Sequence, residues 1–317
     1  MEEPNHVILK LEGGLGNQLF QLAAGYLLAA KINSNLLIDQ YSIPLTTVHG
    51  EKGFGFNEFD IDQLPNGNKI VILKNLPSEL LTKSARKIPN IKKLLLKIRM
   101  RTSNPQGIMH FFELNEVSSV SDFLKINSSA KLHGNFQSWD IVEKAARYGF
   151  PRKFRLLNLP EWIIQLEKQI NFNNSFVLHF RVGDDTRANY NFNQPDISYY
   201  LAALHILRAK KDFARIYILS DDINRVKDMF GNKLDKDFQY LAMPDESSPA
   251  ERLYVLSLFG GIVCANSTFC GWAAWSISNS GGEVVVPVPY SDGPVLGSRD
   301  FPSNWIKLDK YSGAEVS

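Results

Sequence analysis

The amino-acid sequence predicts an α/β protein built from mostly parallel sheets with helices on both faces. Short apolar runs recur along the chain with helical stretches between them, which is the pattern of βα units. The hydrophobic fraction of 44% provides enough apolar residues for sizeable cores, and the charged fraction of 21% is that of a globular protein. Because 317 residues exceed the size at which one core keeps growing, we expect two domains.

The first βα unit lies at the N-terminus. Residues 6–11 (HVILKL) are expected to form a strand, and a glycine-rich turn leads into a helix over residues 18–31. The next strand is expected at residues 35–39 (NLLID).

The second half repeats this alternation more clearly. Strands are expected at 176–180, 215–220, 238–242, 261–265 and 283–287, and helices at 196–211, 223–230, 249–259 and 268–278. Two prolines follow a helical stretch between residues 150 and 165. We place the domain boundary there, with residues 1–155 in the first domain and 156–317 in the second.

Composition and charge exclude several classes of function. A formal net charge of +2 provides no global basic field for nucleic acid. Cys264 and Cys270 form no CxxC pair, which argues against a zinc site and a disulfide framework. The N-terminus lacks the basic start and apolar core of a signal peptide, and 18 apolar residues nowhere run together. We therefore expect a soluble, cytoplasmic protein.

The segment 83–101 (KSARKIPNIKKLLLKIRMR) is basic throughout and contains no acid. The favoured interpretation is a solvated helix whose Lys and Arg stems cover apolar surface. The alternative is contact with anionic lipid headgroups or a lipid-linked substrate, since a basic amphipathic helix can lie on a membrane surface.

Three glycines stand at the first strand-to-helix turn. Without a Cβ, Gly13, Gly14 and Gly16 let the backbone turn sharply and let a ligand approach it, and the N–H groups of a helix start suit an anion or a sugar. Their spacing matches neither the dinucleotide nor the P-loop fingerprint. A tight packing turn would explain the glycines alone, but Asn17 and Gln18 add two amides suited to ligand hydroxyls or phosphate oxygens.

The stretch VLHFRVGDD (177–185) ends an expected strand with charged residues. Strand alternation places His179 and Arg181 on one face, with Asp184 just past Gly183. A guanidinium at the carboxyl end of a strand is placed to bind a diphosphate, because ligands of open α/β sheets bind beyond that edge. The structural alternatives are a salt bridge from Arg181 to Asp184 and, favoured for His179, a buried imidazole with its hydrogen bonds satisfied.

Another expected strand ends in two acids, in ILSDDI (218–223). Asp221 or Asp222 is expected to cap the following helix, the usual role of an Asp at that position. The alternative is that one of them accepts a hydrogen bond from a purine N–H or a ribose hydroxyl.

A fourth stretch, VCANSTFCGWAAW (263–275), brings small polar residues to a helix start. Asn266, Ser267 and Thr268 offer side-chain and backbone donors to a phosphate. Phe269 is a candidate for stacking on a base. The tryptophans at 272 and 275 have helical spacing and are expected in the core.

Together the four stretches resemble the α-1,2-fucosyltransferase family, glycosyltransferase family 11. The family motifs stand in order as GGLGNQLFQ, HFRVGD, ILSDDI and ANSTF, and LHGNFQSWD (132–140) and PDISYYLAAL (195–204) are also similar. The resemblance implies a GT-B-like fold in which two Rossmann-type domains face a central cleft, the first on the acceptor side and the second binding a GDP-sugar. It implies inverting transfer of L-fucose from GDP-β-L-fucose to the 2-hydroxyl of a galactose-type acceptor, with no metal or other cofactor.

Matching the motifs position by position implies a donor site. Arg181 is expected to hold the β-phosphate and Asp221 to help fix guanosine. The full implied set is Gly14, Gly16, Asn17, Gln18, His179, Arg181, Asp221, Asn266, Ser267, Thr268 and Phe269. The chain departs from the family at Val182 and Asp185, where a second Arg and a Tyr are common, and at Gly271, where many members have a Trp.

The expected catalytic residues are Arg181 and Asp184. Arg181 would stabilise the charge on the departing diphosphate. Asp184 ranks ahead of Asp185 and Glu12 as a general base, with the alternative that it only orients the guanidinium.

The expected partners are GDP-fucose and a galactoside, free or lipid-linked, as in the bacterial family members that build O-antigen. The expected location is the cytoplasm, with or without peripheral contact to the inner face of the plasma membrane. The alternatives are another GDP-sugar, another acceptor class, or a non-catalytic carbohydrate-binding protein.

Overall fold

The structure is a computed structural model that describes residues 6–39, 55–61, 63–73, 110–114, 120–183, 194–210, 212, 215–231, 238–290 and 301–316. The basic segment 83–101 lies outside the described residues, as do Asp184 and Asp185. The expectations attached to them stay predictions.

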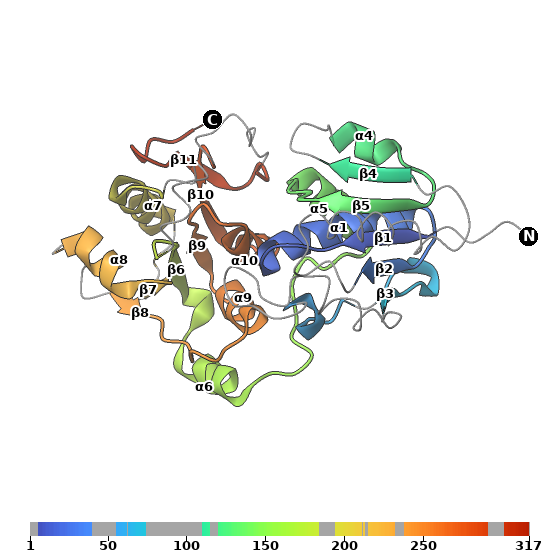
Figure 1. Ribbon diagram of the computed structural model, residues 1–317. Helices are drawn as coiled ribbons and strands as arrows, with labels where there is room; N and C mark the ends of the chain where they lie inside the picture. The colour runs from blue at the N-terminus through green and yellow to red at the C-terminus, as the bar shows by residue number, and fades with distance from the viewer. Residues whose placement is uncertain are drawn as a thin grey trace, which may run out of the picture.

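The first half of the chain forms a five-stranded parallel sheet in the described residues, with strand order β3-β2-β1-β5-β4 (Figure 1). The strands are β1 (Val7–Lys10), β2 (Leu36–Asp39), β3 (Ile70–Leu73), β4 (His110–Leu114) and β5 (Ala130–Gly134). The helices are α1 (Leu15–Lys31), α4 (Val120–Lys125) and α5 (Trp139–Arg147), with short 3₁₀ turns η1 (Gly55–Glu58) and η2 (Pro65–Gly67).

The second half forms a six-stranded parallel sheet, with order β11-β10-β9-β6-β7-β8 in the described residues. Its strands are β6 (Ser175–Phe180), β7 (Arg215–Ser220), β8 (Phe238–Tyr240), β9 (Gly261–Val263), β10 (Glu283–Val288) and β11 (Ile306–Asp309). The helices are α6 (Glu161–Gln169), α7 (Ile197–Lys210), α8 (Ile223–Phe230), α9 (Pro249–Ser257) and α10 (Thr268–Ser278), and η3 (Phe172–Asn174) precedes β6.

These sheets confirm the predicted α/β, GT-B-like architecture of two Rossmann-type units. The chain passes from the first sheet to the second between residues 134 and 175, the stretch that contains the expected boundary at 155/156. Helix α1 begins at Leu15, three residues earlier than expected, because Gly14 has the extended backbone of an N-cap (φ −73°, ψ 173°).

Each sheet has one point where the strand order reverses. In the first sheet the chain runs from β1 outward to β2 and β3 and then adds β4 and β5 on the other side, so the reversal lies between β1 and β5. In the second sheet the same argument places it between β6 and β9. Ligands of open α/β sheets bind outside the carboxyl ends of the strands at such points.

Helices α1 and α10 join the two sheets. Figure 1 shows α1 running from the first sheet toward α10, and the Trp272 indole N–H donates to the Gly16 carbonyl at 2.8 Å. Trp272 and Trp275 are both buried, as their spacing predicted. One hydrophobic cluster contains Leu9 from β1 and Ile262 from β9, so both sheets share a core.

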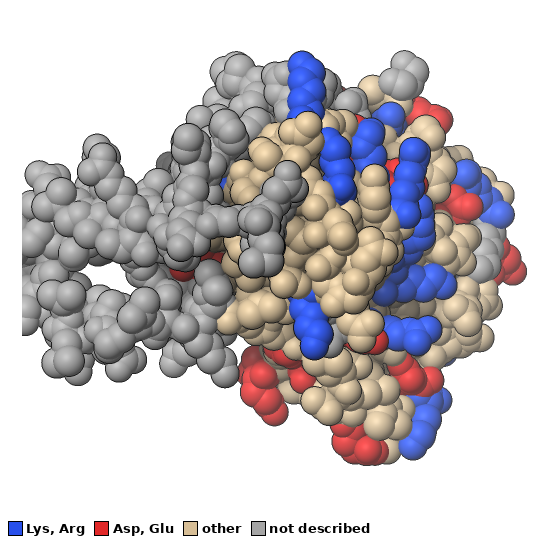
Figure 2. Space-filling model, turned by 90° about the vertical axis from the view of Figure 1, so that its right-hand side faces the viewer, with Lys and Arg blue, Asp and Glu red and all other residues tan. Residues whose placement is uncertain are grey.

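The surface carries charges of both signs. On the side of the first sheet, Figure 2 shows Lys and Arg side chains standing among a larger uncharged area, with Asp and Glu gathered mainly toward the lower and right-hand edges. In the parts of the chain that the structure describes, no helix combines the length and apolar character needed to span a bilayer.

Candidate active site

Arg181 lies at the carboxyl end of β6, beside the reversal point of the second sheet. Its Nη1 contacts Asp221 Oδ2 at 2.9 Å, and the Arg181 side chain keeps 26% exposure. The other oxygen of Asp221 accepts from the backbone N–H groups of Val182 (2.8 Å) and Gly183 (3.1 Å). One carboxylate therefore fixes both the guanidinium and the backbone that follows it, while the guanidinium stays reachable from solvent.

The two acids that end β7 have different contacts. Asp222 is the N-cap of α8, where its carboxylate accepts from the Arg225 N–H at 3.0 Å. Asp221, the first residue after β7, forms the ion pair with Arg181, in the place where the sequence offered Asp184 as a partner. The contact that the sequence predicted between Asp221 and guanosine stays a prediction.

The turn after β9 leads into the first turn of α10, where a ligand-binding role is predicted. Asn266 is fully buried and its Nδ2 donates to the Tyr290 carbonyl at 3.5 Å. Ser267 is the N-cap of α10, but its side chain makes no capping hydrogen bond. The hydroxyl therefore does not satisfy the N–H groups of this helix start, which carry the positive end of the helix dipole.

Gly16 of α1 packs directly on this helix start. A Cβ built on Gly16 would lie 2.5 Å from the Phe269 backbone nitrogen and 2.7 Å from the Thr268 Oγ1. Only a residue without a side chain permits this approach. The sequence predicted glycine for ligand access, whereas the structure shows that Gly16 is also required for contact between the two helices, whose N-termini meet here.

Two amides organise the turn before α1. Gln18 is buried, and its Nε2 donates to the Gly13 carbonyl at 3.0 Å, which holds the turn where Gly13 adopts a positive φ of 78°. Asn17 is partly exposed, and its Oδ1 accepts from Gln137 Nε2 at 2.7 Å. Gly14 is also partly exposed. In the structure the side chain of Gln18 supports the backbone, and Gly13, Gly14 and Asn17 form the accessible part of the turn.

His179 and Phe269 lie together behind the edge that carries Arg181. Their ring centroids are 6.2 Å apart, and His179 is only 6% exposed. The burial agrees with the structural interpretation, but no hydrogen bond to the His179 Nδ1 is found among the described residues, so the expectation that the hydrogen bonds of the imidazole are satisfied stays a prediction. Phe269 is partly exposed, and its predicted stacking on a base stays a prediction.

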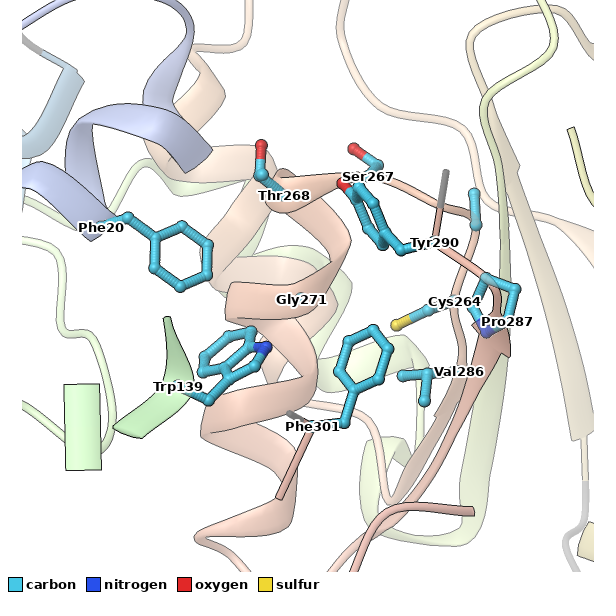
Figure 3. A pocket seen from close by; sticks show the side chains of 11 residues that line it. Phe20, Trp139, Cys264, Ser267, Thr268, Gly271, Val286, Pro287, Tyr290 and Phe301 are labelled. Atoms are coloured by element: carbon cyan, nitrogen blue, oxygen red, sulfur yellow. The ribbon is translucent and has the colours of Figure 1, made fainter. Parts of the chain in front are cut away.

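A small pocket opens between the two halves beside these residues (Figure 3). Ser267 and Thr268 lie at one end of it, and the rings of Phe20, Trp139 and Phe301 surround the rest. At Gly271 a Cβ would lie 2.9 Å from the Trp139 ring, so the glycine at this position makes room for an indole supplied by α5.

Two buried thiols lie near this site, and Cys264 lines the pocket. Cys264 and Cys270 are free and buried, and burial raises the pKa of the Cys270 thiol well above its usual range. The raised pKa disfavours the thiolate of Cys270, and with it nucleophilic or metal-ligating chemistry at that sulfur. In the described ranges no three His, Cys, Asp or Glu side chains are grouped to hold a metal ion.

Several residues that shape the site were not predicted individually. Gln21 exchanges two hydrogen bonds with the backbone of Glu12, Gln137 contacts Asn17, and Trp139 lines the pocket. Gln137 and Trp139 lie in the stretch 132–140, which resembles the family. Gln137 contacts α1 and Trp139 packs against rings of both α1 and α10, so only the fold reveals their roles.

The two parallel sheets, with an arginine and a helix N-terminus at one carboxyl edge, define an α/β protein of the class that binds phosphate-bearing ligands at that edge. Residues 6–309 match the sequence profile of glycosyl transferase family 11, and the chain belongs to this family.

Two proteins of Escherichia coli are similar over nearly the whole length. One is an alpha-1,2-colitosyltransferase, 26% identical over 314 residues, with 96% of this chain and 99% of that protein aligned. The other is the O-antigen biosynthesis glycosyltransferase WbnK, 26% identical over 313 residues, with 94% and 99% aligned. Among solved structures, fucosyltransferase NodZ from Bradyrhizobium aligns with a TM-score of 0.48 and 14% identity, over 86% of this chain and 93% of NodZ.

Proposed function

We propose that this protein transfers L-fucose from GDP-β-L-fucose to the 2-hydroxyl of a galactose-type acceptor, with inversion to an α-linkage and without a metal ion. Membership of glycosyl transferase family 11 supports the class of reaction. The α-1,2 linkage in the name of one relative supports the choice of hydroxyl, and the O-antigen role in the name of the other supports an oligosaccharide acceptor.

The observation that carries the proposal is the position of Arg181. Its guanidinium is fixed by Asp221 at the reversal point of the second sheet and remains accessible to a ligand. A diphosphate bound there meets a fixed positive charge. The start of α10 follows β9, the neighbour of β6 at this point, and adds the positive end of a helix dipole.

The reaction forms one bond and breaks another. The acceptor oxygen bonds to the anomeric carbon of the donor sugar, and GDP leaves from the opposite face with the bonding electron pair. Negative charge grows on the leaving diphosphate, and a fixed guanidinium stabilises that charge without reorganisation. Asp184, the residue predicted as general base, lies outside the described residues, so its role stays a prediction.

A second candidate is transfer of a different sugar from a GDP-linked donor. One relative is named as a colitosyltransferase, and at 26% identity the donor sugar need not be shared. A third candidate, a carbohydrate-binding protein without turnover, predicts sugar binding with no release of GDP.

The test is an Arg181→Ala variant assayed with saturating GDP-fucose and a panel of β-galactosides, with linkage analysis of the product. We expect turnover to fall about a hundredfold, as when one charged transition-state donor is removed. Arg152→Ala is the matched control, because Arg152 is also ion-paired, to Glu143 at 2.8 Å, but its other hydrogen bond is to Asn279, at the opposite end of α10 from Ser267. Near-normal turnover of Arg181→Ala contradicts the proposal. The wild-type protein is also assayed with a panel of other GDP-sugars, and use of one of these in place of GDP-fucose selects the second candidate.

A further inference from the structure

Three titratable side chains meet at the carboxyl edge of the first sheet. Lys10 Nζ lies 3.2 Å from Glu12 Oε2 and 2.8 Å from His133 Nε2, and the same His133 nitrogen lies 3.3 Å from Glu12 Oε2. Lys10 ends β1, Glu12 follows it in the turn, and His133 stands near the end of β5. The donor site described above uses none of them.

The cluster lies at the reversal point of its sheet. Strands β1 and β5 pair in parallel with Leu9 opposite Leu132, which brings Lys10 and His133 side by side at the next position. The reversal point between β1 and β5 is where an open α/β sheet binds ligands. Arg181 occupies the equivalent place in the second sheet.

The backbone at Glu12 is held rigidly. The Glu12 N–H donates to Gln21 Oε1 at 2.9 Å, and Gln21 Nε2 donates back to the Glu12 carbonyl at 3.2 Å. Gln21 itself is fully buried in α1. The helix that holds Glu12 is also the one whose Gly16 contacts the first turn of α10, which links the cluster to the donor side.

The carboxylate is accessible and ionised. The Glu12 side chain is 40% exposed, and those of Lys10 and His133 are 26% exposed. Partial burial acts to raise the pKa of Glu12, but Lys10 and His133 outweigh it, and the net result is a lowered pKa. An anionic oxygen at a ligand-binding edge accepts hydrogen bonds from sugar hydroxyls.

Building on the proposed function, we propose that Lys10, Glu12 and His133 form the acceptor subsite and that Glu12 accepts the proton of the attacking hydroxyl. The carboxylate orients the hydroxyl, and as the new bond between oxygen and carbon forms and GDP departs, the hydroxyl proton passes to Glu12 and then to water. Lys10 and His133 are positioning residues that fix this carboxylate. A carboxylate of low basicity suffices, because the acceptor hydroxyl still holds most of its proton when an oxocarbenium-like transition state is reached.

The test is a Glu12→Gln variant of the full chain, assayed for transfer to β-galactosides, for GDP release without acceptor, and for GDP binding. We expect kcat for transfer to fall about a hundredfold, which is the usual effect of removing a positioned proton acceptor. GDP binding and acceptor-independent GDP release should stay within about twofold, because these depend on the opposite edge. Glu143→Gln is the matched control: its carboxylate is 39% exposed and ion-paired on the same half of the molecule.

A second variant, His133→Gln, tests the positioning role without removing the carboxylate. We expect a raised KM for the acceptor with an unchanged KM for GDP-fucose, which a general loss of folding would not produce. The proposal is overturned if both variants transfer at wild-type rates, or if only Asp184→Asn removes transfer. If the wild-type protein binds GDP but transfers no sugar, the proposed function is contradicted instead. If the wild-type protein also fails to bind sugar acceptors, the acceptor subsite is contradicted as well.

Discussion

At the scale of single residues, Gly16 is constrained by the backbone of another helix. A Gly16→Ala methyl would meet the Phe269 nitrogen at 2.5 Å and the Thr268 carbonyl carbon at 2.7 Å, neither of which can move without displacing α10. We expect Gly16→Ala to lower the free energy of unfolding by about 1–3 kcal/mol, as overpacking does. Urea denaturation measures this.

Gly25→Ala in the same helix is the control for this substitution. Its methyl would meet the side-chain ends of Leu36 and Leu9, at 2.9 and 3.1 Å, which can rotate away. The helix also gains about 1 kcal/mol when Ala replaces Gly. Equal losses in the two variants would contradict the close contact of α1 with α10.

Glu12 makes part of the stability depend on pH. Its pKa is lowered below the ordinary value of 4.5, so its stabilising contribution is fully present above that value and is lost as pH falls through the folded-state pKa. The contribution is modest, since the side chain is 40% exposed and water screens the charges. We expect wild type to melt above Glu12→Gln at pH 7 and the difference to close at acid pH. A difference that stays constant from pH 7 to pH 3 would rule out this ion-pair contribution.

At the scale of elements, the N-cap serines of α9 and α10 differ in role: one stabilises its helix with its side chain, and the other is proposed to bind a ligand. Ser248 forms a capping box with Glu251 and also donates to Glu58 Oε2 at 2.5 Å, so its hydroxyl stabilises α9 and ties it to η1. Ser267 caps α10 without a side-chain hydrogen bond. We expect Ser248→Ala to cost about 1 kcal/mol of unfolding free energy. Ser267→Ala should cost much less.

The variant that loses less stability, Ser267→Ala, should lose more affinity for GDP than Ser248→Ala. GDP titration by calorimetry should show weaker binding for Ser267→Ala and wild-type binding for Ser248→Ala, because only Ser267 stands at the proposed phosphate site. If Ser267→Ala is the less stable variant and binds GDP normally, the assignment of that helix start is wrong.

At the scale of the whole molecule, the sequence predicts the second sheet better than the first. Strand β7 and helices α8 and α10 coincide with their predicted ranges, because each is a continuous apolar or amphipathic run that ends at a strong local signal. Strands β3, β4 and β5 of the first sheet and β11 of the second were not predicted. In β5 the polar Lys131 and His133 interrupt the apolar pattern, and pairing with β1 compensates for the weak local preference.

In the site, too, residues within a local motif were predicted from the sequence, whereas contacts between distant segments were not. The sequence identifies Arg181 and the helix start at Ser267 because each is a local motif. It does not reveal that Asp221 pairs with Arg181, since that contact follows from the adjacency of β6 and β7. Lys10 and His133 are more than a hundred residues apart and meet only because β1 pairs with β5.

Because the two sheets share a core, we expect the hydrogen bond between the two halves to contribute to the stability of the whole molecule. Two buried tryptophans allow a test. Trp272 and Trp305 are 0% and 3% exposed, but Trp272 Nε1 donates to Gly16 across the two halves, whereas Trp305 Nε1 has no hydrogen-bond partner among the described residues. Replacement by Phe removes a similar volume from each site. Trp272→Phe also removes the indole N–H bond to the Gly16 carbonyl, which keeps its helical backbone partner, and loss of one such bond costs about 0.5–1.5 kcal/mol. We expect its unfolding free energy to fall below that of Trp305→Phe by this amount in urea denaturation, and equal values would show that the hydrogen bond between the halves contributes no net stability.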